Sequence, residues 1–164
     1  MYFVGKFPEK ADFGSDRLIP LDIGNVEAND FRGTDGHLQS ALKVLAERNI
    51  NIKTLTIAEV SDFGIVRMIV NDTDNAVRAL KESHYTCSVT EVLALQIDDS
   101  PGSLLRALET FSKNGLNIEY MYAFTEKRDD NAVMIFRFDD IEEAKKVLIA
   151  EGFNLVKKID IIGE

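Results

Sequence analysis

Cysteine, tryptophan, proline and positive charge are all scarce in this chain of 164 residues. The single cysteine, Cys87, excludes a disulfide within the chain and a cysteine cluster for zinc. Acidic residues outnumber basic ones by 28 to 19, and the net charge of −9 argues against nucleic acid, whose binding depends on clustered Lys and Arg. No apolar run approaches the ~18 residues of a membrane span, and the first residues lack a signal-peptide pattern. We therefore expect a cytoplasmic protein with no membrane partner.

Catalytic motifs are missing as well. His37 and His84 have no cysteine or carboxylate at metal-ligand spacing. Cys87 has no visible paired base, so we expect a packed small residue rather than a nucleophile. The pairs Asp98-Asp99 and Asp139-Asp140 each lie where a strand ends and a helix begins, a place where Asp caps helices. We therefore predict no catalytic residue, no metal and no cofactor.

The clearest local pattern runs from Asp98 to Tyr122. It reads as the end of a strand, a Pro-Gly turn, an amphipathic helix, a glycine stop and a second strand. We expect Pro101 in the first helical turn and Gly115 in the left-handed position after the helix. The apolar stripe of the helix consists of Leu104, Ala107, Leu108 and Phe111.

The same order of elements occurs twice, so the chain contains an internal repeat. Gly36 and Gly102 are 66 positions apart, and after two single-residue insertions the offset becomes 68. By this register, the first strand of the first repeat should lie near Val26–Phe31. Aligned pairs include Leu42 with Leu108, Asn51 with Asn117, and Leu80 with Leu148.

Each repeat reads as β-α-β-β-α-β, the ferredoxin-like unit. We predict an α+β fold of two such units, each with an antiparallel sheet in the order 4-1-3-2 and both helices on one face. Residues 1–24 are expected to form an irregular extension, residues 25–90 the first unit and residues 91–164 the second.

One predicted strand is apolar on both faces. Val133 and Ile135 point to one face, and Met134, Phe136 and Phe138 point to the other. A half-exposed strand would alternate with polar residues instead, so the second face of the sheet should also be covered. We expect face-to-face packing of sheets, within or between chains.

The glycine turns at Gly36 and Gly102 and the asparagines Asn51 and Asn117 are the candidate binding residues. Each can be an ordinary turn residue, and neither a GxGxxG motif nor a P-loop lysine is present. All four belong to one corner of the fold, at a helix start and an exposed edge strand. Pairing of two edge strands would place the loop of one repeat beside the asparagine of the other, which favours binding. Free N–H groups at a helix start suit an anion.

Three segments together resemble the ACT domain, a small ligand-sensing module of amino-acid metabolism. They are Asp-Ser-Pro-Gly-Ser-Leu (99–104), Asn-Gly-Leu-Asn-Ile (114–118) and Arg-Asn-Ile-Asn-Ile (48–52). The resemblance covers about Thr34 to Ile161, and the duplication is similar to that of stand-alone tandem-ACT proteins that bind amino acids.

This resemblance implies a regulatory amino acid bound between two paired ACT units. The loop of one unit and the start of the second strand of its neighbour would contact the ligand. In the second repeat, the implied binding residues are Asp99, Ser100, Gly102, Ser103, Leu104, Asn117 and Ile118. In the first repeat, they are Asp35, Gly36, His37, Leu38, Asn51 and Ile52, with Asp35 in place of the usual Pro.

The sequence therefore predicts a non-catalytic regulatory homodimer that binds an amino acid between paired ACT units and acts on a separate protein. An assembly module that binds no ligand is the alternative. An RNA-recognition module would need stacking aromatics on the central strands and a basic surface. An acylphosphatase-like enzyme would need an arginine loop with a catalytic asparagine, and no segment matches well. Which amino acid binds stays open, because backbone groups contact only the carboxylate and ammonium that all amino acids share.

Overall fold

The computed structural model describes residues 21–26, 37–60, 63–124 and 131–162, which form two successive units. The N-terminal unit consists of β1 (Leu21–Val26), α1 (His37–Glu47), β2 (Ile52–Val60), β3 (Phe63–Val70), α2 (Thr73–Glu82) and β4 (Thr86–Val89). The C-terminal unit consists of β5 (Leu93–Asp98), α3 (Ser103–Lys113), β6 (Ile118–Ala123), β7 (Asn131–Phe138), α4 (Ile141–Ala150) and β8 (Asn154–Leu155), followed by α5 (Lys158–Ile162).

Each unit contains a four-stranded antiparallel sheet. The strand orders are β2-β3-β1-β4 and β6-β7-β5-β8, which confirms the predicted order 4-1-3-2 in both units. The predicted β-α-β-β-α-β succession is confirmed too. In each sheet, the strand that follows the first helix, β2 or β6, lies at an edge and pairs with one neighbour only.

The first strand lies earlier than the sequence predicts. β1 comprises Leu21–Val26, and Leu21 pairs with Met68 on one side and Val89 on the other. The prediction near Val26–Phe31 is therefore wrong, and residues 27–31 lie outside the described part of the chain. Residues 21–24 belong to the first unit rather than to the extension. Leu21 and Ile23 alternate with polar Asp22 as a strand requires, whereas Glu27-Ala28-Asn29-Asp30 is poor in strand formers.

A glycine with positive φ lies at each end of α3. Gly102 is the N-cap residue with φ +84°, so Pro101 lies in the preceding turn and not in the first helical turn as predicted. Gly115 has φ +71°, which confirms the left-handed position after the helix. Asn49, which is 66 positions earlier, takes the same region at φ +55°. Asparagine tolerates this conformation better than most residues do.

Aspartate caps α2 and α4. Asp72 accepts a hydrogen bond from the backbone N–H of Asn75 at 3.0 Å, and Asp140 accepts one from Glu143 at 2.9 Å. The same prediction for Asp98-Asp99 is wrong, because α3 has no side-chain cap. The Pro-Gly turn delays the start of that helix until Ser103.

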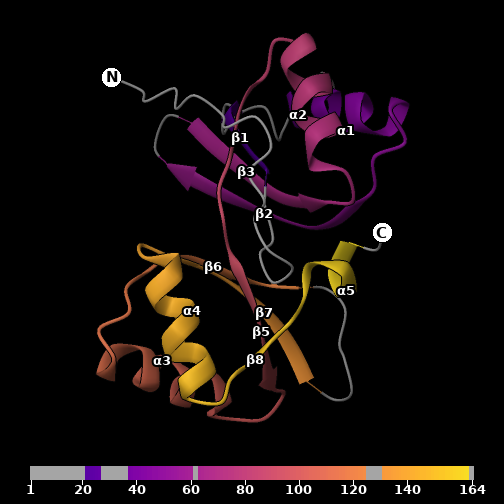
Figure 1. Cartoon of the computed structure of the whole chain (residues 1–164). Coiled ribbons are helices and arrows are strands. Elements are labelled where there is room, and N and C mark those ends of the chain that lie inside the picture. The colour runs from indigo at the N-terminus through magenta and orange to yellow at the C-terminus, as the bar shows by residue number, and fades with distance from the viewer. Residues whose placement is uncertain (1–20, 27–36, 61–62, 125–130, 163–164) are drawn as a thin grey trace.

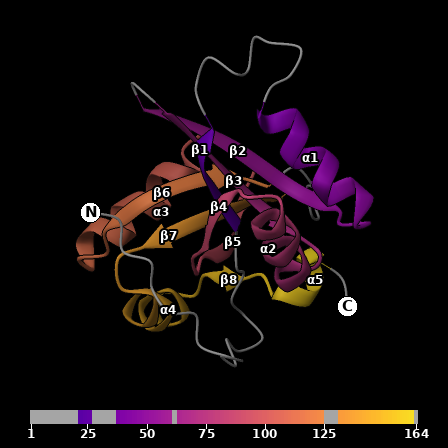
Figure 2. The same cartoon turned by 90° about the horizontal axis from the view of Figure 1, so that it is seen from above.

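The strand β7 connects two apolar cores. Phe136 and Phe138 pack with Phe111 beneath the helices of the C-terminal unit, in T-shaped contacts of 5.4 and 5.5 Å. Val133 and Ile135 face the other way, into a core that also contains Ile69 of the N-terminal unit. The helices thus lie on the outside and the two sheets face each other (Figures 1 and 2). The predicted face-to-face packing is confirmed, and it occurs within one chain.

Polar contacts join the two units near their open edges. Thr54 on β2 donates to the carbonyl of Ala123 on β6 at 3.4 Å, and the Arg67 guanidinium lies 4.2 Å from the centre of the Tyr120 ring. The connecting segment is held as well: the Thr90 and Tyr120 hydroxyls lie 2.9 Å apart. β2 therefore lies over β6, and the sheets are stacked rather than joined edge to edge.

Candidate functional site

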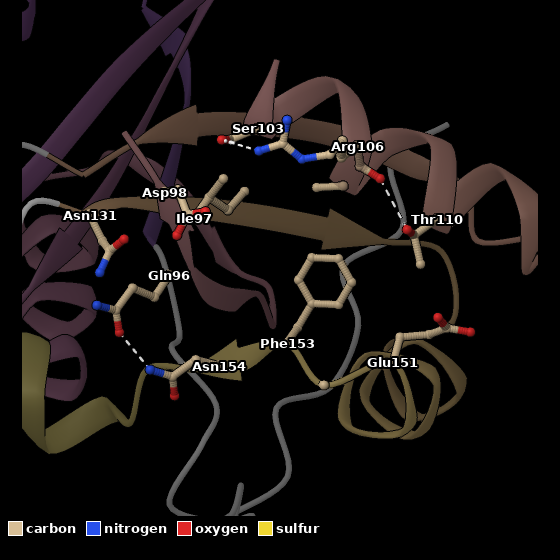
Figure 3. A pocket seen from close by; sticks show the side chains of 12 residues that line it. Gln96, Ile97, Asp98, Ser103, Arg106, Thr110, Asn131, Glu151, Phe153 and Asn154 are labelled. Atoms are coloured by element: carbon tan, nitrogen blue, oxygen red, sulfur yellow. Dashed lines mark hydrogen bonds between the residues drawn. The ribbon is translucent and has the colours of Figure 1, made fainter. Parts of the chain in front are cut away.

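The turn between β5 and α3 forms a compact hydrogen-bonded corner. The hydroxyls of Ser100 and Ser103 lie 2.7 Å apart. Nη2 of Arg106 donates to the Ser103 Oγ at 2.8 Å (Figure 3). The backbone N–H of Ser103 donates to the Ser100 carbonyl at 3.1 Å. We call Ser100, Gly102, Ser103 and Arg106 the α3 corner. Ser103 is only 6% exposed, so a buried hydroxyl positions the arginine.

The turn itself requires Gly102. Its φ of +84° would strain any other residue, whereas a Cβ there would meet Nη1 of Arg106 only at an ordinary contact distance of 3.4 Å.

The α3 corner offers positive electrostatic potential next to a groove that also contains the carboxylates of Asp98 and Glu151. Arg106 places a positive charge in the first turn of a helix, where the dipole is already positive and the N–H groups point outward. In the part of the chain that the structure describes, no carboxylate forms an ion pair with Arg106. A carboxylate ligand at this corner would therefore be stabilised by both the guanidinium and the helix terminus.

A groove of about 430 Å³ opens beside the α3 corner, between α3 and the segment that joins α4 to β8 (Figure 3). The Phe153 ring and Ala107 provide apolar surface, and Arg106 is the single positively charged residue in its lining. The Gln96 side-chain oxygen accepts from Asn154 Nδ2 at 2.5 Å. The full lining is Gln96, Ile97, Asp98, Ser103, Arg106, Ala107, Thr110, Asn131, Glu151, Gly152, Phe153 and Asn154.

The predicted residues of the second repeat are separated by α3. Ser100, Gly102 and Ser103 meet at the corner, whereas Leu104 and Ile118 pack against the core of the unit. Asn117 follows the opposite end of α3, whose 11 residues span about 16 Å. One small ligand cannot contact both ends of α3 within a single unit. Asp99 is exposed in the turn.

The predicted residues of the first repeat are less informative. Asp35 and Gly36 lie outside the described residues, and His37 begins α1. Leu38 and Ile52 pack against the core of the N-terminal unit. Asn51 is exposed, and its N–H donates to the side chain of Asn71 at 2.8 Å, as in a turn.

Sequence reasoning missed Arg106, Phe153 and Glu151, three lining residues of the groove. The signal that could have identified two of them is the difference between the repeats. At offsets of 66 and 68, Ser40 takes the place of Arg106 and Ser83 takes the place of Glu151. The N-terminal unit therefore builds the same fold without these charges. In the C-terminal unit, Glu151 accepts a hydrogen bond from Asn114 Nδ2 at 3.3 Å, and Arg106 donates to Ser103.

The described residues contain no group of three or more His, Cys, Asp or Glu that could hold a metal ion. None of their helices is long and apolar enough to span a membrane. Burial raises the pKa of the Cys87 thiol, an effect that the positive charge of Lys81 partly opposes. Cys87 donates a weak hydrogen bond to the Val77 carbonyl at 3.9 Å.

The chain is similar to known proteins in both sequence and fold. A family model described as an ACT domain pair matches residues 30–163. The crystal structure of protein BT0572 from Bacteroides thetaiotaomicron is similar, with 33% identity, a TM-score of 0.80, and coverage of 92% of this chain and 99% of that one. The regulatory subunit of aspartate kinase from Thermus thermophilus shares the fold at 14% identity and a TM-score of 0.57, with 84% and 91% of the two chains covered. The search of curated proteins found no match.

Proposed function

The chain belongs to the family of ACT domain pairs, and we propose that it is a non-catalytic regulatory protein that binds an amino acid at the α3 corner. The observation that supports this proposal most directly is the arrangement of Arg106. Its guanidinium is held by the buried Ser103 hydroxyl beside a helix N-terminus, and no carboxylate among the described residues pairs with it.

Each group of the ligand has a counterpart in the C-terminal unit. The α-carboxylate accepts from Arg106, from the hydroxyl of Ser100 and from N–H groups at the Gly102 turn. The ammonium donates to Asp98 or Asp99, at the end of β5. The ligand side chain extends into the groove towards Phe153.

A second copy of the chain completes the site in this proposal. Asn117 and Ile118 lie at the far end of α3 from the corner, so they reach a ligand only from a neighbouring unit across an open edge. The functional form is then a homodimer that acts in the cytoplasm on a separate target protein. The corresponding corner of the N-terminal unit, from Asp35 to Leu38, has Ser40 instead of an arginine and should bind more weakly.

Thermal unfolding against each of the twenty amino acids tests the proposal. A ligand at 100 times its dissociation constant stabilises the folded state by about 2.7 kcal/mol, which raises Tm by roughly 5–10 °C for a chain of this size. Arg106→Gln should abolish the shift. Arg78→Gln is the matched control, because Arg78 also donates to a side chain three residues earlier but lies on α2.

The alternative function is an assembly module that binds no ligand. The open edges of β2 and β6 favour it, since unpaired strand edges readily recruit another chain. If no amino acid raises the Tm of well-folded protein, the amino-acid proposal fails and the assembly function is left.

A further inference from the structure

The groove beside the α3 corner has charged side chains at both of its ends. Asp98, Ser103 and the guanidinium of Arg106 lie at one end (Figure 3). Thr110 and Glu151 lie at the other end. Ser103 and Thr110 are seven residues apart on α3, which corresponds to about 10 Å along the helix axis. A zwitterion bound at the α3 corner therefore leaves the Glu151 end of the groove for the side chain of the ligand.

The negative charge of Glu151 is not neutralised by a basic residue. Its Oε1 accepts a hydrogen bond from Nδ2 of Asn114 at 3.3 Å, and the same amide donates to the Thr110 carbonyl at 2.9 Å. The amide positions the carboxylate next to α3 but carries no charge. Among the residues that the structure describes, no Lys or Arg forms an ion pair with Glu151. A carboxylate has about four acceptor sites, so Glu151 can also accept from a ligand.

The N-terminal unit pairs an acidic residue at the same helix end with an arginine. Nη2 of Arg48 lies 2.6 Å from Oε2 of Glu82, and this ion pair joins the ends of α1 and α2. At the offset of 66, Asn114 takes the place of Arg48, and at the offset of 68 Glu82 corresponds to Ala150, next to Glu151. The second repeat thus keeps the link between its helices as a hydrogen bond and loses the positive charge. A cationic group of a ligand would restore that charge pair.

The middle of the groove suits a long side chain with an apolar stem. Phe153 lies between the two ends, and Ala107 adds apolar surface (Figure 3). Lysine and arginine side chains bury their methylene stems along such surface while the charged head stays in a polar environment. The groove volume of about 430 Å³ is near the small end of the range for ligand sites, which fits a molecule of amino-acid size.

We propose that the amino acid bound at the α3 corner has a positively charged side chain, and that Glu151 selects it. This inference rests on the proposed function, because the α-carboxylate lies at Arg106 and the α-ammonium at Asp98 or Asp99. The ligand side chain then passes Phe153, and its charged head donates to Glu151. Lysine, ornithine and arginine have this chemistry, whereas an acidic amino acid would bring a second negative charge to Glu151.

Titration calorimetry of the full chain with lysine, arginine, norleucine and glutamate tests the preference. Norleucine has the stem of lysine without the terminal ammonium group. The wild type should bind lysine or arginine more tightly than norleucine and glutamate. Glu151→Gln should weaken binding of the basic amino acid about fivefold, the upper value for an exposed ion pair, and leave norleucine binding unchanged. Glu151→Lys should reverse the preference in favour of glutamate.

Glu109→Gln and Glu109→Lys are the matched controls, because Glu109 is an exposed glutamate on α3 outside the lining of the groove. Both should keep the wild-type preference, and circular dichroism checks that all four variants are folded. A chain that responds only to amino acids without a positive side chain would overturn the inference and leave the proposed function standing. A preference for lysine or arginine that persists in Glu151→Lys would overturn it too. If none of the twenty amino acids binds, the proposed function fails and this inference fails with it.

Discussion

Arg106 and Ser40 occupy the same position in two helices that otherwise follow one pattern. The apolar residues of the stripe agree in both copies, because the fold requires them: Ala41 and Ala107 are both buried. The polar positions differ, because folding leaves them free. A charge that only one copy carries, placed where the helix dipole opposes it and hydrogen-bonded to Ser103, is the feature on which the proposed ligand site rests.

Cys87 provides a prediction at the scale of a single residue. Burial raises the pKa of its thiol, and the thiolate is the reactive form, so the folded protein should react with iodoacetamide more slowly than the unfolded protein at pH 8. Because the folded state disfavours the thiolate, its contribution to the free energy of unfolding should fall as the pH rises past the ordinary thiol pKa. Mass spectrometry of timed samples measures the rate, with urea-unfolded protein as control. Equal rates in the two states would contradict the prediction.

The helices differ in which groups accept hydrogen bonds from the backbone N–H groups of their first turns. α2 and α4 begin at an aspartate whose side chain accepts from the backbone three residues on. α3 begins at a left-handed glycine without such a cap, so its first turn is open to a ligand. α2 and α4 are thus capped by side chains of the chain itself, whereas α3, the candidate binding helix, is not.

Replacing the cap of α4 tests this difference. Asp140→Ala should lower the free energy of unfolding by about 1 kcal/mol, because it removes the acceptor for the Glu143 N–H. For a chain of this size that is roughly 2–4 °C in Tm. Asp98→Ala is the control, and it should change Tm little because Asp98 does not cap α3. If Asp140→Ala and Asp98→Ala lower Tm by the same amount, the loss does not come from the helix cap, and the prediction fails.

The packing of the two sheets determines how the whole molecule behaves. Ile69 of the N-terminal unit is 1% exposed in a core formed mainly by the C-terminal unit, which also contains Val156 and, from α5, Ile161. Neither unit can expose its inner sheet face without losing this core. We therefore expect the two units to unfold together.

Truncation of Ile69 tests that expectation. Ile69→Ala should lower the free energy of unfolding by about 2–5 kcal/mol, because it removes buried apolar surface and leaves a cavity. Denaturant unfolding, followed by circular dichroism, should show one transition in wild type and variant alike. Ile149→Ala is the control, since Ile149 is 58% exposed and should change stability by no more than about 0.5 kcal/mol. Two separate transitions, with only one shifted, would mean that the units unfold independently.

Periodicity along the chain was sufficient to predict the repeat, the order of elements and the sheet order. These features depend on local spacing: the stripe from Leu104 to Phe111, the two-sided apolar pattern of residues 133–138, and the left-handed Gly115. Connection rules then leave few topologies for β-α-β-β-α-β. Only the tertiary structure decided that the sheets stack within one chain, that β1 begins at Leu21, and that α3 separates Gly102 from Asn117. It also brought Arg106 and Phe153 to one groove. Such contacts join residues far apart in the sequence, and local spacing carries no information about which distant surface will cover an apolar face.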